Sequence, residues 1–128
     1  MSSQQVHGFL VVLFFLVRST STSDLAIASD DSEKNAFFET KIRPALHEHC
    51  LNCHNVGKKN GGLSLDSRDG WMQGGDSGPA IVPGQPDESL LLRSIQHLEA
   101  GLEMPAKAPK LSDGMLEDFR KWIADGAV

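Results

Sequence analysis

The chain has 128 residues, 40% of them hydrophobic and 23% charged, and its formal net charge is −5 at pH 7. This length suits one domain at most, and the composition is that of an ordinary globular protein. An acidic chain is not expected to bind nucleic acid, because that binding requires basic patches on the protein surface. A domain this small often needs a metal, a disulfide or a cofactor to stabilise its core.

Residues 1–28 are predicted to be a secretory signal peptide. Residues 9–17 (FLVVLFFLV) form an unbroken apolar run, which is too short for a membrane span because a spanning helix needs roughly 20 residues. Residues 26–28 (AIA) then fit a small-x-small cleavage site before Ser29. The alternative is an uncleaved hydrophobic tail or a buried helix. We therefore expect an exported, periplasmic protein that contacts the membrane only through this segment if it is uncleaved, with a polar linker over residues 29–34.

Helical periodicity begins at about Asn35, where we place the start of a folded domain that spans residues 35–128. Apolar side chains recur from there at spacings of three to four, as in a helix with one buried face. Pro44 has no backbone N–H to donate, so it should kink this helix or start a second one at about Arg43.

Residues 47–55 (HEHCLNCHN) hold three of the five histidines and both cysteines of the chain. Four kinds of site could use them: a zinc site, a redox dithiol, a disulfide or a covalent haem. A zinc site would lack its usual second pair of ligands, since His97 is the only distant candidate. A redox dithiol needs a βαβ context that this sequence does not show. A disulfide between Cys50 and Cys53 would close too small a loop to stabilise the fold much.

A covalent haem accounts for the whole cluster. In the pattern C-x-x-C-H, the two thiols form thioethers with the two vinyl groups of one porphyrin. Cys50 and Cys53 lie three residues apart and His54 follows four after Cys50, so on a helical turn the three side chains share one face. The imidazole of His54 is then predicted to be the proximal ligand of the iron. His47 and His49 are expected on the preceding helix, partly exposed to solvent.

Residues 55–84 are predicted to be loop and turns, because they contain eight of the twelve glycines of the chain together with two prolines. A loop of this length in a small domain normally has a role, such as wrapping a ligand.

Two more helices are predicted after this loop, so the fold class is all-α with three to four helices and little or no sheet. The first spans residues 86–98, where Leu91, Ile95 and Leu98 recur at helical spacing before Gly101. The second lies within residues 112–127. Ser112 can cap its start, Gly126 suits the left-handed position after its end, and the residues between them carry an apolar stripe. That stripe comprises Met115, Phe119 and Trp122.

Three methionines that follow the initiator could supply the sixth iron ligand. Met104 is favoured, because Pro105 disfavours helical geometry for its predecessor and leaves the thioether on an extended loop. Met72 and His97 stay open as alternatives. Met115 lies on the apolar stripe of the last helix, where a packing role is expected.

The chain resembles the planctomycete-type cytochrome c domain, within the class I c-type cytochromes. The resemblance covers about residues 37–127 and rests on the Met104–Pro105 pair and three longer stretches: FFETKIRPALHEHCLNCH, GGLSLDSRDGWMQGGDSGPAIVPGQPDESLLLRSI and KWIADGA. The GGDSGPAIVPG part of the second stretch is the most specific to this family. It implies a small cytochrome c-like fold whose long loops wrap a covalent haem. It also implies that the first and last helices cross, with Phe37 or Phe38 near Phe119 and Trp122.

The resemblance further implies a haem c bound through Cys50 and Cys53, with His54 and Met104 as axial iron ligands. A His/Met ligand set leaves no open position on the iron, so an electron-transfer protein with redox protein partners is favoured over an enzyme. The alternatives are a haem-based sensor or peroxidase-like module in which Met104 dissociates, and a zinc-stabilised interaction module. In this family the domain commonly opens a longer exported protein, so the chain is either a stand-alone cytochrome or one module of a larger protein.

Overall fold

The computed structural model describes the backbone of residues 22–128 and the side chains from Asp30 onward. The apolar run of the predicted signal, residues 9–17, lies outside the described residues. The elements in chain order are α1 (Thr22–Phe37), the π-helical turn η1 (Phe38–Ile42), α2 (Arg43–His49), the 3₁₀ turn η2 (Asn60–Gly62), α3 (Arg68–Gln73), the 3₁₀ turn η3 (Pro86–Glu88), α4 (Leu90–Ile95) and α5 (Asp113–Ala124).

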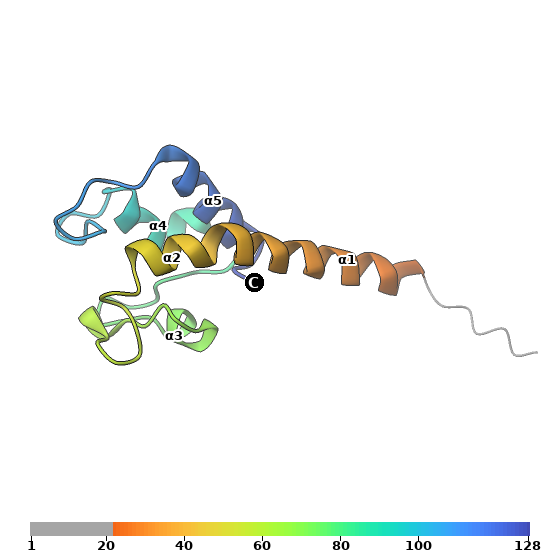
Figure 1. The fold of residues 1–128 in the computed structure, drawn as a ribbon, viewed down its shortest axis with the longest axis horizontal. Coiled ribbons are helices and arrows are strands. Elements are labelled where there is room, and N and C mark those ends of the chain that lie inside the picture. The colour runs from red at the N-terminus through yellow and green to blue at the C-terminus, as the bar shows by residue number, and fades with distance from the viewer. Residues whose placement is uncertain (1–21) are drawn as a thin grey trace, which may run out of the picture.

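The all-α prediction is confirmed for the described part of the chain, where an isolated bridge between Gly75 and Gly78 is the only β-type pairing. α1 and α2 follow one another along a single long rod, and α3 lies on one side of it with α4 and α5 on the other (Figure 1). Within residues 22–128, no helix combines the length and the apolarity that crossing a membrane requires.

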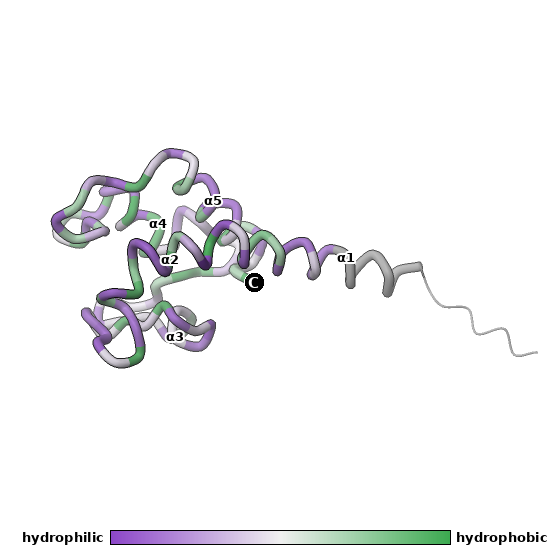
Figure 2. The backbone as a smooth tube through the Cα atoms, in the orientation of Figure 1, coloured by the Kyte–Doolittle hydropathy of each residue, from purple (hydrophilic) through white to green (hydrophobic). Residues whose placement is uncertain are grey.

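The polar stretch 29–34, which we predicted to be a linker, is instead helical because α1 runs through it. Asp30 and Lys34 lie one turn apart on this helix, and their side chains form an ion pair at 2.6 Å. Such pairs support helices whose surface is polar all round, and this part of α1 is largely hydrophilic (Figure 2). The polar composition of residues 29–34 therefore does not mean that this segment lacks regular structure.

The predicted interruption at Pro44 is confirmed. α2 begins at Arg43 with Pro44 in its first turn, and the chain immediately before it widens into the π-helical turn η1. Pro44 cannot donate a hydrogen bond to the carbonyl four residues earlier, and a wider turn is one way to accommodate that missing donor. The helix axis nevertheless continues from α1 into α2 (Figure 1).

The prediction that residues 55–84 contain only loop and turns was wrong at α3. Ser67 caps this short helix, since its hydroxyl accepts a hydrogen bond from the backbone N–H of Gly70 at 3.1 Å. Gly70 lies inside the helix, and a Cβ atom there would come within 2.6 Å of the carbonyl oxygen of Ser64. This glycine therefore permits close packing of helix against loop and does not mark a turn.

The helix predicted over residues 86–98 is shorter than expected. α4 ends at Ile95, and His97 takes a left-handed conformation with φ of 59°. The N–H of Leu98 then bonds the carbonyl of Arg93 at 2.9 Å, which is the hydrogen bond that closes a Schellman motif. Leu98, which we placed on the apolar side of the helix, is instead 70% exposed because the chain turns away before it.

The core joins segments that are distant in the sequence. Phe38 of η1, Trp71 of α3 and Trp122 of α5 pack together, with ring centroids 5.3 to 5.7 Å apart. The contact between Phe38 and Trp122 confirms that the first and last helices meet. The last helix itself is as predicted: Ser112 caps α5 by accepting a hydrogen bond from the N–H of Met115, and Gly126 adopts a positive φ of 100°.

Two glycine-to-alanine substitutions should have opposite effects on stability. Gly70→Ala should lower the free energy of unfolding by about 1–3 kcal/mol, because its Cβ would clash with the Ser64 carbonyl. Gly114→Ala in the first turn of α5 should raise it by roughly 0.5–1 kcal/mol, since nothing lies within 4 Å of that Cβ and alanine favours the helix. Denaturant unfolding of the full chain measures both. Effects of the same sign would contradict this packing.

Candidate functional site

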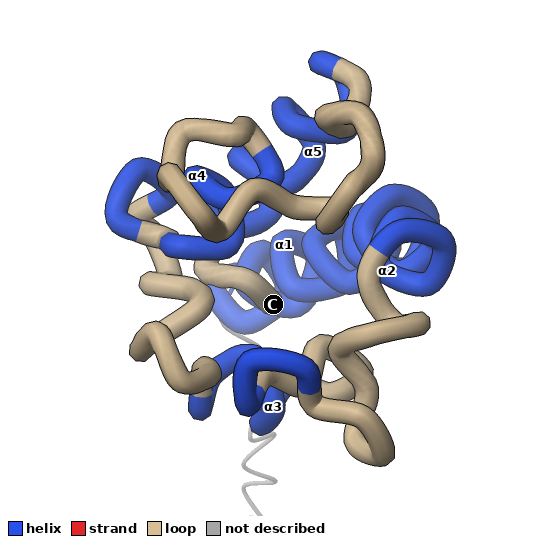
Figure 3. The backbone as a smooth tube through the Cα atoms, turned by 90° about the vertical axis from the view of Figure 1, so that its left-hand side faces the viewer, coloured by secondary structure: helices blue, strands red, loops and turns tan. Residues whose placement is uncertain are grey.

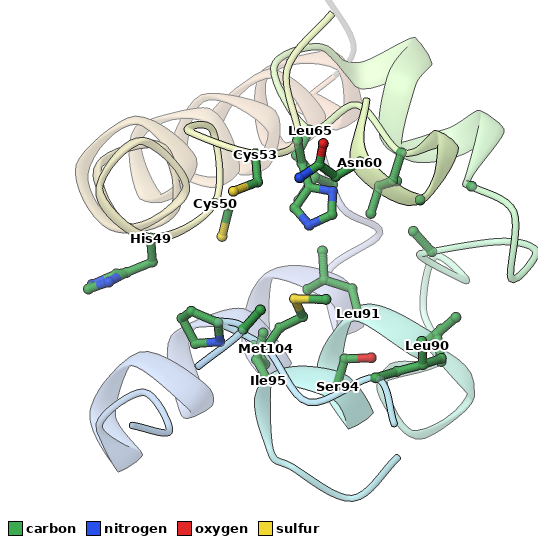
Figure 4. Close-up of a pocket in the computed structure, with 18 of the residues that line it drawn as sticks. His49, Cys50, Cys53, Asn60, Leu65, Leu90, Leu91, Ser94, Ile95 and Met104 are labelled. Atoms are coloured by element: carbon green, nitrogen blue, oxygen red, sulfur yellow. The ribbon is translucent and has the colours of Figure 1, made fainter. Parts of the chain in front are cut away.

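The two cysteines lie on a tight turn directly after α2. The carbonyl oxygen of Cys50 accepts hydrogen bonds from the N–H of Cys53 at 3.1 Å and from the N–H of His54 at 3.0 Å. These bonds keep the backbone coiled over the whole Cys50–His54 segment. In Figure 4 the side chains of Cys50 and Cys53 lie on the same side of the cavity.

The cavity next to this turn has a volume of about 390 Å³. Volumes of this order are typical of small-molecule and cofactor sites. Figure 3 shows α3 on one side of the molecule and α4 and α5 on the other. The walls are mostly apolar and come from the long loop, α4, the segment before α5, and α5 itself. The main apolar lining residues are Leu63, Leu65, Ala80, Leu90, Leu91, Ile95, Leu102, Leu111 and Phe119.

Met104 lies on the wall opposite the cysteines, next to Leu91 and Ile95 of α4 (Figure 4). Its side chain is half-buried and packs against the core. Met72 and Met115 are also half-buried against the core, but neither they nor His97 line the cavity. Among the sixth-ligand candidates, the structure thus brings Met104 alone to the cavity wall.

His54 lines the same cavity, and its Nδ1 atom is buried with no hydrogen-bond partner in the described part of the chain. No protein group therefore ties this nitrogen to another role. The carbonyl of His54 accepts a hydrogen bond from the N–H of Leu65 at 2.8 Å, which joins the turn to the wall of the long loop. His47 is exposed on α2, and the half-buried His49 points away from Cys50 and Cys53 (Figure 4).

Residues 50–107 match the family described as Planctomycete cytochrome C. This match supports a planctomycete-type cytochrome c domain over these residues. The matched segment begins at the first cysteine and ends just after Met104. No curated protein and no solved structure gives a significant match.

The matched family implies a covalently attached haem, and the residues that line this cavity fit such a group. Both cysteines are free thiols, as thioether formation requires. The cavity walls are apolar, as a porphyrin requires, and the His54 imidazole and the Met104 thioether both line them. The zinc alternative finds no support, because no three His, Cys, Asp or Glu side chains of the described residues could hold a metal ion together.

Two residues hold Met104 in a way that the sequence did not predict. The N–H of Met104 donates to the carbonyl of Ser94 at 3.0 Å, and the Nε2 atom of His97 lies 3.1 Å from the carbonyl oxygen of Met104. Between His97 and Met104 the chain reverses at Gly101, which has a positive φ of 83°. That glycine was the available sequence signal, and we interpreted it only as a helix end.

The two thiols differ in their surroundings. Burial raises the pKa of the Cys50 thiol to about 11, whereas Cys53 is exposed. Only the thiolate is a good nucleophile, so Cys50 should be the less reactive thiol as long as this end of α2 stays folded.

Alkylation of haem-free protein should reveal this difference. In single-cysteine variants, Cys53 in Cys50→Ala should react with iodoacetamide at about pH 8 at least about tenfold faster than Cys50 in Cys53→Ala, because far less of Cys50 is thiolate. Mass spectrometry over time gives the two rates. In denaturant the rates should converge, and equal rates without denaturant would show that burial does not raise the pKa of the Cys50 thiol.

Proposed function

We propose that this cytochrome c domain is an electron-transfer protein whose haem is attached to Cys50 and Cys53 and whose iron is ligated by His54 and Met104. The observation that supports this assignment is that one cavity gathers all four side chains from the α2 turn and from the loop before α5. The other two methionines of the folded domain, Met72 and Met115, lie outside it.

When bound, the haem would supply a one-electron Fe(III)/Fe(II) couple. The protein side chains would set the reduction potential of that couple and shield the iron from water. The thioether of Met104 is a soft ligand that favours Fe(II) and so raises the reduction potential. With His54 and Met104 both bound, no position remains open for a substrate. The apolar walls around them would exclude water from the iron.

The domain is also proposed to act outside the cytoplasm, in the periplasm, with other redox proteins as its partners. The support for this location is the signal-like pattern of residues 1–28 and the family match, since domains of this class are typically exported.

The role of both cysteines can be tested by removing them together. Protein carrying Cys50→Ala and Cys53→Ala should hold no covalent haem, because no other cysteine exists in the chain. Haem staining after denaturing electrophoresis of the exported protein measures attachment. Met72→Ala is the matched control and should stain like the wild type. Haem that still migrates with the double variant would defeat the proposed attachment.

Met104→Ala should open the distal position while leaving His54 and both thioethers in place. The ferric iron should become high-spin or take water, the reduction potential should fall, and carbon monoxide should bind the ferrous protein. Visible spectra and a redox titration measure these changes. Met72→Ala and Met115→Ala should keep the spectrum and cost only packing stability.

Two outcomes would contradict this proposal. If Met104→Ala keeps the spectrum of methionine-ligated haem while another methionine variant loses it, then Met104 is not the sixth ligand. If the wild-type protein already binds carbon monoxide readily at neutral pH, the sensor or peroxidase-like function is favoured over electron transfer.

A further inference from the structure

Both backbone polar groups of Met104 are hydrogen-bonded, one to the last turn of α4 and the other to the turn that follows α4. Its N–H donates to the carbonyl oxygen of Ser94 at 3.0 Å, and its carbonyl oxygen lies 3.1 Å from Nε2 of His97. A carbonyl oxygen can only accept, so Nε2 of His97 must carry the hydrogen. The bond from His97 is made by a side chain, so a substitution at position 97 can remove it. The bond to Ser94 joins two backbone groups and cannot be removed in this way.

His97 makes this contact from an uncommon backbone conformation. Its φ of 59° lies in the left-handed region, which residues other than glycine adopt infrequently, although histidine is among the more tolerant ones. The N–H of His97 bonds the carbonyl of Ser94 at 3.1 Å, so this carbonyl accepts from both His97 and Met104. The left-handed turn thus carries the His97 ring to the loop that contains Met104.

The segment that follows Met104 contributes little burial to hold it in place. Residues 106–110 are exposed, and Leu111 is the next buried residue. The Met104 side chain itself is only half-buried. The thioether is one weak ligand, so its occupancy depends on how well the backbone keeps it directed into the cavity.

We propose that His97 is a positioning residue that keeps Met104 in place as an iron ligand by donating a hydrogen bond to its carbonyl. This inference rests on the proposed function, because it assumes that Met104 binds the iron. His97 does not line the cavity, so it acts on the iron only through Met104.

The test compares three substitutions at position 97 in the haem-loaded protein. His97→Asn tolerates the left-handed backbone but is too short to reach the carbonyl, and His97→Gly removes the side chain without backbone strain. His97→Gln places an amide donor at a similar reach. His47→Asn is the matched control, since His47 is an exposed histidine on α2 outside the cavity.

The measurement is a titration of the ferric protein with free imidazole, which competes with Met104 for the iron. Loss of the methionine–iron charge-transfer band gives the apparent affinity. His97→Asn and His97→Gly should raise this affinity roughly three- to tenfold, as expected from one lost hydrogen bond. His97→Gln should restore a value near that of the wild type, and His47→Asn should leave it unchanged.

The outcomes separate this inference from the proposed function. If Met104→Ala leaves the charge-transfer band intact, Met104 is not the ligand and the proposed function fails. If Met104→Ala abolishes the band while His97→Asn and His97→Gly bind imidazole like the control, only the positioning role is overturned. Should His97→Gln behave like His97→Asn, the hydrogen bond is not the cause of the effect.

Discussion

The packing of Phe38, Trp71 and Trp122 is the contact on which the rest of the structure depends. These three rings come from η1, α3 and α5, and their mutual contacts hold together segments separated by up to 84 positions. Aromatic pairs of this kind bury large apolar areas and favour particular relative orientations. Because α2 follows η1 directly, the same contact sets where the turn from Cys50 to His54 stands relative to α5.

The cavity lies among the elements that this aromatic contact arranges. Backbone hydrogen bonds complete its walls, with the N–H of Leu65 bonded to the carbonyl of His54 and the N–H of Leu91 bonded to the carbonyl of Ala80. The turn, the long loop and α4 are therefore tied to one another around one space. A porphyrin bound there would add apolar contacts to each wall, so haem attachment and folding of this loop should stabilise each other.

The glycines of the long loop have two different physical roles, and composition does not distinguish them. A Cβ at Gly75 would come within 2.4 Å of the carbonyl oxygen of Gly61, and one at Gly70 would clash with Ser64. These glycines allow two stretches of backbone to approach each other. Gly78 instead adopts a positive φ of 99° with open space around it, which is the usual requirement of a turn. In the sequence alone all of them are typical of turns, and α3 was therefore not predicted.

The sequence by itself determined the features that depend on neighbouring residues. The spacing of Cys50, Cys53 and His54 is set within one helical turn, the start of α2 follows from the missing N–H of Pro44, and the capping of α5 is local. The tertiary structure decided which methionine reaches the cavity and how it is held. Those outcomes depend on contacts between distant segments, such as the hydrogen bonds from the end of α4 to Met104, and no local spacing encodes them.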